Sequence, residues 1–127
     1  MKILLDTHSF LWFLGGNSEL SAQAKTYIEN PLYEKYISIA SFWEIAIKNS
    51  LGKLTLDVPF VELKIEAVKN RFQILPITFE DTLQLNMLPY IHRDPFDRII
   101  ISQAIKNDLI LISCDKNFSL YNVNLIW

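Results

Sequence analysis

"KILLD", residues 2–6, is a short apolar run that ends in an acid, and similar runs recur along the chain. Further Ile- and Leu-rich runs of strand length lie at residues 36–40, 72–77 and 109–114, and "VNLIW" at 123–127 adds a final short strand. Continuous apolar runs of this length are typical of strands covered on both faces, as in a parallel sheet. The sequence therefore predicts a mostly parallel central sheet.

Segments with helical spacing separate these runs, at residues 21–30, 41–52, 61–72, 78–88 and 94–108. Strands that alternate with helices favour a three-layer α/β/α sandwich built from right-handed crossovers. Only "LGKLTLDVP", residues 51–59, has the composition of a longer connection. We therefore expect a single domain over residues 1–127, in the α/β class.

Helix ends are well marked. Three starts place a capping side chain three residues before an acid: Ser41 with Glu44, Thr78 with Asp81, and Asp94, followed by Pro95, with Asp97. Two ends are marked by Gly52 and Asn107.

Composition narrows the choice of partners. Half of the residues are apolar, enough for a core without disulfides or a structural metal. The net charge is only −2 and the charges are interleaved, which excludes a basic nucleic-acid arm and a polyacidic tail. A polyanion must therefore be held locally, by a few Lys and Arg or by a bound cation.

The location is predicted to be cytoplasmic. Cys114 is the one cysteine, which excludes an internal disulfide and fits a reducing compartment. Its surroundings, "LILISCD", favour a small buried hydrophobic residue over a nucleophile. The N-terminal segment begins like a signal peptide, but Asp6 and His8 interrupt its apolar part. No later apolar run approaches the roughly 20 residues that a membrane span needs, so we expect no membrane association.

Four acids are predicted to lie along one edge of the sheet. In a parallel α/β sheet the carboxyl ends of the strands and the amino ends of the helices share the edge where ligands bind. Asp6 and Asp115 follow strands, and Glu44 and Asp97 lie in the first turns of helices, so all four belong to this edge.

Each of these acids, taken singly, has a structural explanation. An acid at the third helical position is favoured by about 0.3–1 kcal/mol through the capping box and the helix dipole. An Asp after a strand often starts a turn. Several converging carboxylates repel one another, however, and a divalent cation is the natural compensation. With no His or Cys in tight ligand spacing, Mg²⁺ fits better than Zn²⁺, and Mn²⁺ is an alternative.

Four motifs in order carry a family resemblance: "LLDTH" at 4–8, "SFWEIAIK" at 41–48 with "LGKL" after it, "HRDPFDRIIISQA" at 92–104, and "LISCDKNF" at 111–118. Together they closely resemble PIN-domain ribonucleases of the VapC toxin kind, over essentially the whole chain. The resemblance implies a PIN-like domain and a metal-dependent endoribonuclease.

The resemblance also implies the roles of individual residues. Asp6, Glu44, Asp97 and Asp115 take the positions of the family's acidic residues, with Asp6 and Asp97 as the principal Mg²⁺ ligands. A metal-activated water would attack an RNA phosphodiester and leave a 5′-phosphate and a 3′-hydroxyl. The hydroxyl-bearing residues near the acids are expected to support them through hydrogen bonds: Thr7, Ser9 and Ser113.

Residues 91–100, "IHRDPFDRII", contain a His, an Arg and two acids around a Pro and then become apolar. We expect Asp94 to cap the helix and Asp97 to face the metal, although Asp94 competes for the ligand role. Arg98 could steer a carboxylate or contact phosphate, but a surface ion pair is the more frequent use of an isolated Arg. His92 lies outside the helix and could touch RNA, but such a His is more often a hydrogen-bonded structural residue, and we do not count it among the ligands.

The resemblance implies two protein partners: a small antitoxin and a second copy of the chain, in a homodimer. The aromatic residues near the acids could form a groove for an apolar partner helix, although such stripes are more often core: Trp12, Phe13, Phe42 and Trp43. A basic antitoxin side chain in the acidic pocket would displace or mimic the metal.

Other functions explain fewer residues. A receiver-type phosphotransfer domain expects adjacent acids after its first strand and an Asp after a central strand, which this chain lacks. A dinucleotide-binding domain lacks its Gly-rich turn. A cysteine hydrolase built on Cys114 and His8 leaves the acids unexplained. A catalytically idle PIN-like RNA-binding or scaffold domain remains the main alternative.

Overall fold

A computed structural model describes residues 1–127 and contains one five-stranded sheet, in the order β3-β2-β1-β4-β5, with every neighbouring pair parallel. The strands are β1 Lys2–Leu5, β2 Glu34–Ser38, β3 Phe72–Leu75, β4 Ile110–Ile112 and β5 Asn124–Ile126. In the register of the central strands, Leu5 of β1 lies beside Ile37 of β2 and Ile112 of β4. The residues that follow these three therefore meet at the carboxyl edge.

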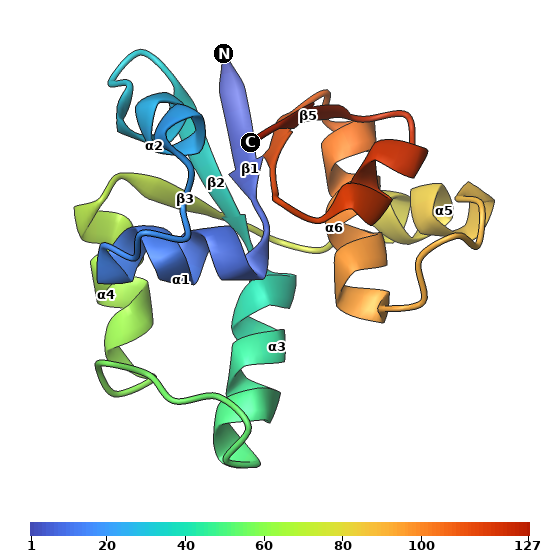
Figure 1. Ribbon diagram of the computed structural model, residues 1–127. Helices are drawn as coiled ribbons and strands as arrows, with labels where there is room; N and C mark the ends of the chain where they lie inside the picture. Colours follow the sequence, from blue (N-terminus) through green and yellow to red (C-terminus); the bar gives the residue numbers. More distant parts are fainter.

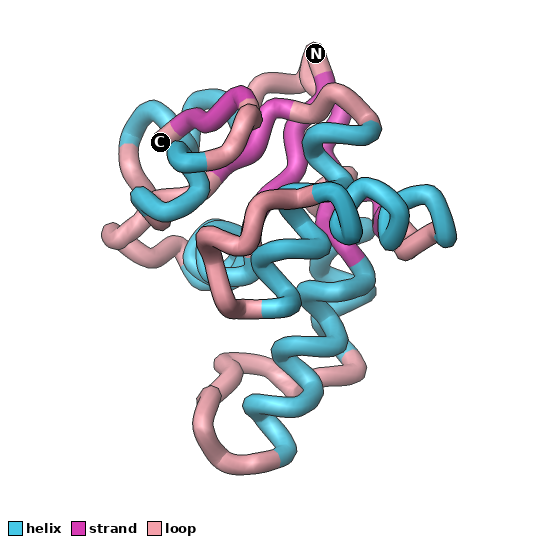
Figure 2. The backbone as a smooth tube through the Cα atoms, turned by 90° about the vertical axis from the view of Figure 1, so that its right-hand side faces the viewer, coloured by secondary structure: helices cyan, strands magenta, loops and turns pink.

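Helices cover both faces of the sheet (Figures 1 and 2). Their bounds are α1 Thr7–Gly15, α2 Ala22–Glu29, α3 Ile39–Ser50, α4 Glu62–Lys69, α5 Phe79–Met87 and α6 Pro95–Lys106, with a short 3₁₀ helix, η1, at Lys116–Leu120. Figure 1 shows α1, α2 and α4 on one side of β1 and α5 and α6 on the other, while α3 extends away from the sheet. No helix combines the length and the apolar character that a membrane crossing requires.

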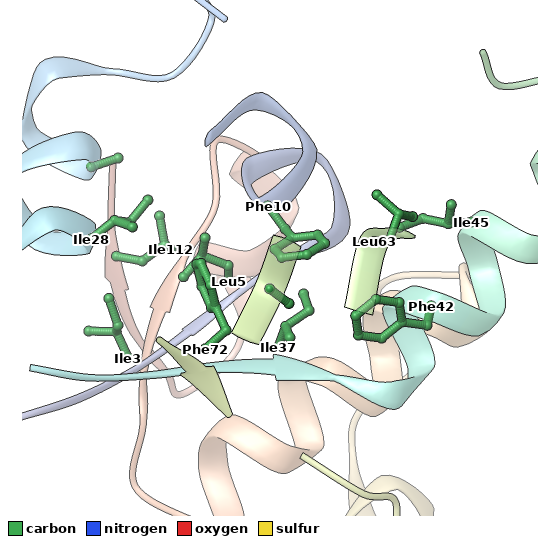
Figure 3. Packing of buried hydrophobic residues seen from close by; sticks show 12 residues of the cluster. Ile3, Leu5, Phe10, Ile28, Ile37, Phe42, Ile45, Leu63, Phe72 and Ile112 are labelled. Carbon is green, nitrogen blue, oxygen red and sulfur yellow. The ribbon is translucent and has the colours of Figure 1, made fainter. Parts of the chain in front are cut away.

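The alternation of side chains along β1 divides the core into two layers. Ile3 and Leu5 point to the layer under α1–α4, which is centred on Phe10 and Phe72 (Figure 3). Leu4 points to the opposite layer, with α6 and η1. Because successive strand residues face opposite sides, a strand buried on both faces must be apolar throughout. This explains the unbroken "ILL" of the central strand.

The connections around β1 create a switch point. After β1 the chain enters α1, which packs in one core layer, whereas after β4 it enters η1, which packs in the other. Neighbouring parallel strands whose connections leave to opposite faces open a crevice between their carboxyl ends, and ligands of such sheets bind there. Here this crevice lies between Asp6 and the residues that follow Ile112.

The architecture confirms the predicted three-layer sandwich, and the sheet is parallel throughout. All five strands and the five predicted helices are present within a few residues of their expected bounds. Two elements, α1 and η1, were not predicted. Residues 10–14 of α1 are all apolar, without the polar face that marks a surface helix, because most of them pack in or against the first core layer.

Most predicted caps are confirmed. Thr78 and Asp81 form a reciprocal capping box, Asp94 caps α6 with Pro95 in its first turn, and Asn107 ends that helix. Gly52 adopts a left-handed φ of 71° just after α3. Predicting Ser41 as a cap was wrong.

The true cap of α3 is Ser38, the last residue of β2, whose side chain accepts the N–H of Ala40 at 3.0 Å. The apolar run 36–40 hides this boundary, because Ile39 and Ala40 continue the composition of the strand although they are already helical. Glu44 therefore lies in the second turn of α3, and not at the third helical position.

Asp81 is expected to be the stability-determining acid of α5. It is buried, accepts the N–H of Thr78 at 2.9 Å and lies 3.3 Å from the amide nitrogen of Gln103 on α6. Asp81→Ala should lower the free energy of unfolding by about 2–4 kcal/mol, because it removes one half of the capping box and one of the two acceptors of the Gln103 amide, which keeps only the carbonyl oxygen of Pro76. Glu80→Ala, an exposed acid of the same turn, should change it by less than about 0.5 kcal/mol. Equal losses in urea denaturation of the two variants would contradict this assignment.

Candidate active site

Asp6 lies at the switch point, directly after β1, and is buried. Its backbone N–H donates to Ile112 of β4 at 3.1 Å, which extends the β1–β4 pairing by one residue. Its carboxylate caps α1 by accepting the N–H of Ser9 at 2.9 Å. The strand and the helix thus fix this carboxylate from both sides.

Ser113 links the acid after β1 to the acid after β4. Its hydroxyl donates to Asp6 Oδ2 at 2.5 Å and accepts the N–H of Asp115 at 3.0 Å. Because Ser113 is buried, these two bonds hold the two acid-bearing turns in a fixed relation. A role in supporting the acids, expected for Ser113, agrees with this geometry.

Glu44 reaches the same region from α3 and is also buried. One carboxylate oxygen accepts the hydroxyl of Thr7 at 2.7 Å, and the other lies 2.6 Å from Nζ of Lys48, one turn further along α3. The Thr7 oxygen also lies 3.0 Å from Oγ of Ser41. Ser41 therefore supports the first turn of α1, not the start of its own helix.

Asp97 lies in the first turn of α6, where its N–H donates to the capping carboxylate of Asp94 at 3.0 Å. Its side chain is 21% exposed, with Oδ2 3.1 Å from Nε2 of His92. The same nitrogen lies 3.2 Å from Oδ2 of Asp115. His92, Asp97 and Asp115 thus bring three ligand-type atoms within 4.8 Å of one another.

The pKa shifts reflect this crowding of charge. Burial, and after it the charges of four acids, raise the pKa of Asp97 to about 8: Asp94, Glu44, Asp6 and Asp115. Burial also raises the pKa of Asp6, while hydrogen bonds from Ser113 and from the Ser9 amide partly offset the increase. The hydrogen bond to Glu44 raises the pKa of Lys48, so its ammonium stays charged beside the cluster.

The oxygen atoms of the cluster fit a divalent cation. Hydrogen bonds or ion pairs engage both oxygens of Asp6, Glu44 and Asp115, but Asp97 Oδ1 makes none. The hydroxyl oxygen of Ser9, fully buried one turn from Asp6, also lacks a partner. Carboxylate and hydroxyl oxygens with unused lone pairs at an acidic cluster suit Mg²⁺ or Mn²⁺.

The four predicted acids therefore lie around one region, with Thr7, Ser9 and Ser113 in contact with them or beside them. Sequence reasoning missed Lys48 and Ser41. Lys48 follows Glu44 by four residues, a spacing that places both on one helix face and could have revealed the pair. No local signal reveals that Ser41 contacts Thr7, 34 residues earlier in the chain.

Two side-chain predictions were wrong. Cys114 is exposed, because β4 ends at Ile112 and the chain turns toward the surface after it. Partial burial and the charge of Asp6 raise the pKa of its thiol, which disfavours a thiolate nucleophile. Arg98 makes no surface ion pair, because it is buried, with its guanidinium 3.2 Å from the carbonyl oxygen of Pro89 and 5.0 Å from the ring centre of Tyr90.

The aromatic residues near the acids divide between core and surface. Phe42 is buried and Trp43 is 59% exposed, while Trp12 and Phe13 are partly buried. Trp12 lines a groove of about 360 Å³ between α1, the loop before α4 and α4 itself. Trp43 instead packs edge-on against Phe96 of α6.

Asp97 should make the stability of the metal-free protein depend on pH. With a folded pKa of about 8, the folded chain keeps a proton that the unfolded chain loses above about pH 4, so rising pH in this window favours unfolding. Relative to the wild type, Asp97→Asn should therefore gain about 1–3 kcal/mol in free energy of unfolding between pH 5 and pH 8. Urea denaturation in EDTA measures this, with exposed Glu62→Gln as the control. If the free energy of unfolding of Asp97→Asn differed from that of the wild type by the same amount at pH 5 and at pH 8, the raised pKa of Asp97 would be refuted.

Comparisons with known proteins agree with this architecture. The PIN domain family model matches residues 3–124. None of the curated proteins compared with this chain matches it.

Three solved structures share the fold. VapBC2 from Rickettsia felis, bound to a promoter DNA fragment, has a TM-score of 0.72 at 16% identity, over 100% of this chain and 99% of that chain. A toxin–antitoxin complex from Klebsiella pneumoniae has a TM-score of 0.67 at 20% identity, over 98% of this chain and 96% of that chain. VapBC-1 from nontypeable Haemophilus influenzae has a TM-score of 0.67 at 16% identity, over 99% of this chain and 97% of that chain. With a family match over nearly its whole length and a sheet of the same architecture, this chain belongs to the PIN domain family.

Proposed function

We propose that this chain is a Mg²⁺-dependent endoribonuclease that acts as the toxin of a toxin–antitoxin pair, with Mn²⁺ as an alternative metal. One observation carries the proposal: Asp97, whose Oδ1 has no partner, has its pKa raised to about 8 by burial and by the charges of four other carboxylates, those of Asp94, Glu44, Asp6 and Asp115. Such repulsion is costly unless a cation relieves it. Membership of the PIN family and the likeness to toxin–antitoxin structures support the same function.

The proposal gives each acid a role. Asp6 and Asp97 hold the metal, directly or through water, and Glu44 and Asp115 complete the acidic pocket. Thr7 and Ser113 orient Glu44 and Asp6 through their hydrogen bonds, and Ser9 holds Asp6 through its backbone N–H. A bound Mg²⁺ supplies a more acidic water as nucleophile and neutralises charge that develops on the phosphate.

The substrate is RNA, cut at a phosphodiester to leave a 5′-phosphate and a 3′-hydroxyl. Acidic side chains repel phosphate, and the whole chain carries a net charge of −2. The cation therefore has to attract the backbone at this pocket. Lys48, whose charged ammonium lies 2.6 Å from Glu44, is a protein group that could contact an adjacent phosphate.

The proposed partner is a small antitoxin. The three compared structures are toxin–antitoxin or VapBC complexes, which supports a partner of this kind. The groove beside Trp12 offers apolar side chains from α1 and from the loop before α4, together with Asp57 and Glu66. An amphipathic antitoxin segment with basic residues would match this lining, and a basic side chain placed in the acidic pocket would mimic the metal.

We also propose that the chain works in the cytoplasm as one domain and as a homodimer. Three apolar side chains lie exposed along one stripe of α5: Phe79, Leu83 and Met87. Figure 1 places α5 on the side of the sheet opposite α4, so a dimer contact there leaves the groove beside Trp12 accessible. Exposed apolar stripes of this kind commonly mark protein interfaces.

RNA cleavage by the purified, partner-free protein should require both Mg²⁺ and Asp97. We expect discrete fragments from total cellular RNA with Mg²⁺, none with excess EDTA, and at least a 100-fold lower rate for Asp97→Asn, which keeps the shape of the side chain but loses its charge. Exposed Glu62→Gln, prepared in the same way, controls for contaminating nucleases. Full activity of Asp97→Asn would mean that Asp97 only stabilises the first turn of α6. Inactivity of the wild type on a broad RNA pool would favour a catalytically idle RNA-binding domain.

Light scattering after size exclusion should detect the homodimer. The wild type should have twice the chain mass of 14.8 kDa, and Leu83→Glu should shift toward the monomer because it places a charge in the apolar contact. Leu32→Glu changes another exposed leucine, in the turn before β2, and should remain dimeric. A monomeric wild type would refute the homodimer, and a dimeric Leu83→Glu would place its contact elsewhere.

A further inference from the structure

His92 is the one nitrogen-bearing side chain that contacts two of the four acids. We propose that His92 is a positioning residue that holds Asp97 and Asp115 by a shared hydrogen bond, so that Asp97 presents Oδ1 to the metal, and that His92 is not itself a ligand. This inference rests on the proposed metal-dependent function.

The imidazole lies between the two carboxylates. Its Nε2 is 3.1 Å from Oδ2 of Asp97 and 3.2 Å from Oδ2 of Asp115, so one N–H is shared by two acceptors. Only 13% of the His92 side chain is exposed, which limits competition from water for this bond. The donated hydrogen offsets the repulsion between two oxygens that face each other.

The other ring nitrogen decides between a positioning role and a ligand role. Nδ1 of His92 accepts the backbone N–H of Asp94 at 3.3 Å. An imidazole whose Nδ1 accepts must carry its hydrogen on Nε2, where it points at Asp97 and Asp115. A metal on Nε2 would move that hydrogen to Nδ1 and bring two N–H groups face to face. The arrangement of Asp94 and His92 therefore opposes metal binding by the imidazole.

The backbone around His92 is anchored independently of the acids. The hydroxyl oxygen of Tyr121 accepts the N–H of His92 at 2.7 Å and that of Ile91 at 3.1 Å. The imidazole also packs on Phe118 of η1, with ring centres 5.7 Å apart. These contacts come from the C-terminal part of the chain, so the position of the ring is set by the fold and not by the carboxylates.

The contact with His92 fixes how the Asp97 carboxylate is oriented. Because His92 engages Oδ2, only Oδ1 of this carboxylate is left for a cation. Asp97 would therefore be a monodentate ligand and not a bidentate one. Asp115 is held in the same manner, because Asn117 N–H occupies its Oδ1 at 2.9 Å and His92 its Oδ2. Groups that orient a metal ligand in this way commonly change metal affinity by about 10–100-fold when removed.

Metal binding without RNA tests this role. Titration calorimetry with MnCl₂ would compare the wild-type chain with His92→Leu, which removes the donor, and His92→Gln, whose side-chain amide can donate from a similar position. We expect His92→Leu to bind Mn²⁺ at least 10-fold more weakly and His92→Gln to stay within about threefold of wild type. Arg93→Leu, an exposed change in the same loop, should bind like wild type.

Pulsed electron paramagnetic resonance of the wild-type Mn²⁺ complex needs no variant and addresses the ligand question directly. A positioning role predicts no nitrogen bound to Mn²⁺, and the characteristic coupling of a directly bound imidazole nitrogen would overturn the proposal. Unchanged Mn²⁺ affinity in a folded His92→Leu, equal losses in His92→Leu and His92→Gln, or no Mn²⁺ binding by the wild type would each overturn it too. RNA cleavage is not used as a readout, so these results stand apart from the cleavage assay that tests the proposed function.

Discussion

Repulsion among the carboxylates between β1 and β4 is the constraint on which the arrangement of this site depends. Four partly or fully buried acids from different elements approach one another, and the rise in the pKa of Asp97 to about 8 expresses the cost. The surrounding groups reduce that cost in different ways: Lys48 balances Glu44 by charge, Ser113 donates to Asp6, and His92 lies between the remaining two acids. Asp97 keeps one unengaged oxygen, where a cation would relieve the remaining repulsion.

The fold produces this convergence through the two-sided burial of its sheet. Core layers cover both faces of β1, and the connections after β1 and β4 enter opposite layers. Because these connections diverge, a crevice opens between the carboxyl ends of the two strands. Asp6 and Asp115 are the turn residues at that crevice, and Asp97 reaches it from the start of α6. Asp6 and Asp115 also cap α1 and η1, so the same side chain contributes to local stability and to the candidate site.

Local features were predictable from the sequence, and contacts across the fold were not. Thr78 with Asp81 and Asp94 with Pro95 lie within one helical turn of each other, so their pattern identifies the helix start. The start of α3 was misplaced because apolar residues continue from strand into helix after Ser38. Placing the acids at one edge needed only the parallel topology, whereas the contacts of His92 with Asp115 and with Tyr121 join residues that are 23 and 29 positions apart.

If a divalent cation completes this acid cluster, its binding must change the ionisation of Asp97, and measuring that ionisation is the most direct test. Carbon-13 NMR of the labelled Asp97 carboxyl, followed over pH in EDTA and again in saturating Mg²⁺, reports its pKa in both states. The account predicts a pKa of about 8 in EDTA and a clearly lower value in Mg²⁺, because a bound cation favours the charged form. A pKa in the ordinary range of an aspartate in EDTA, unchanged by Mg²⁺, would contradict it.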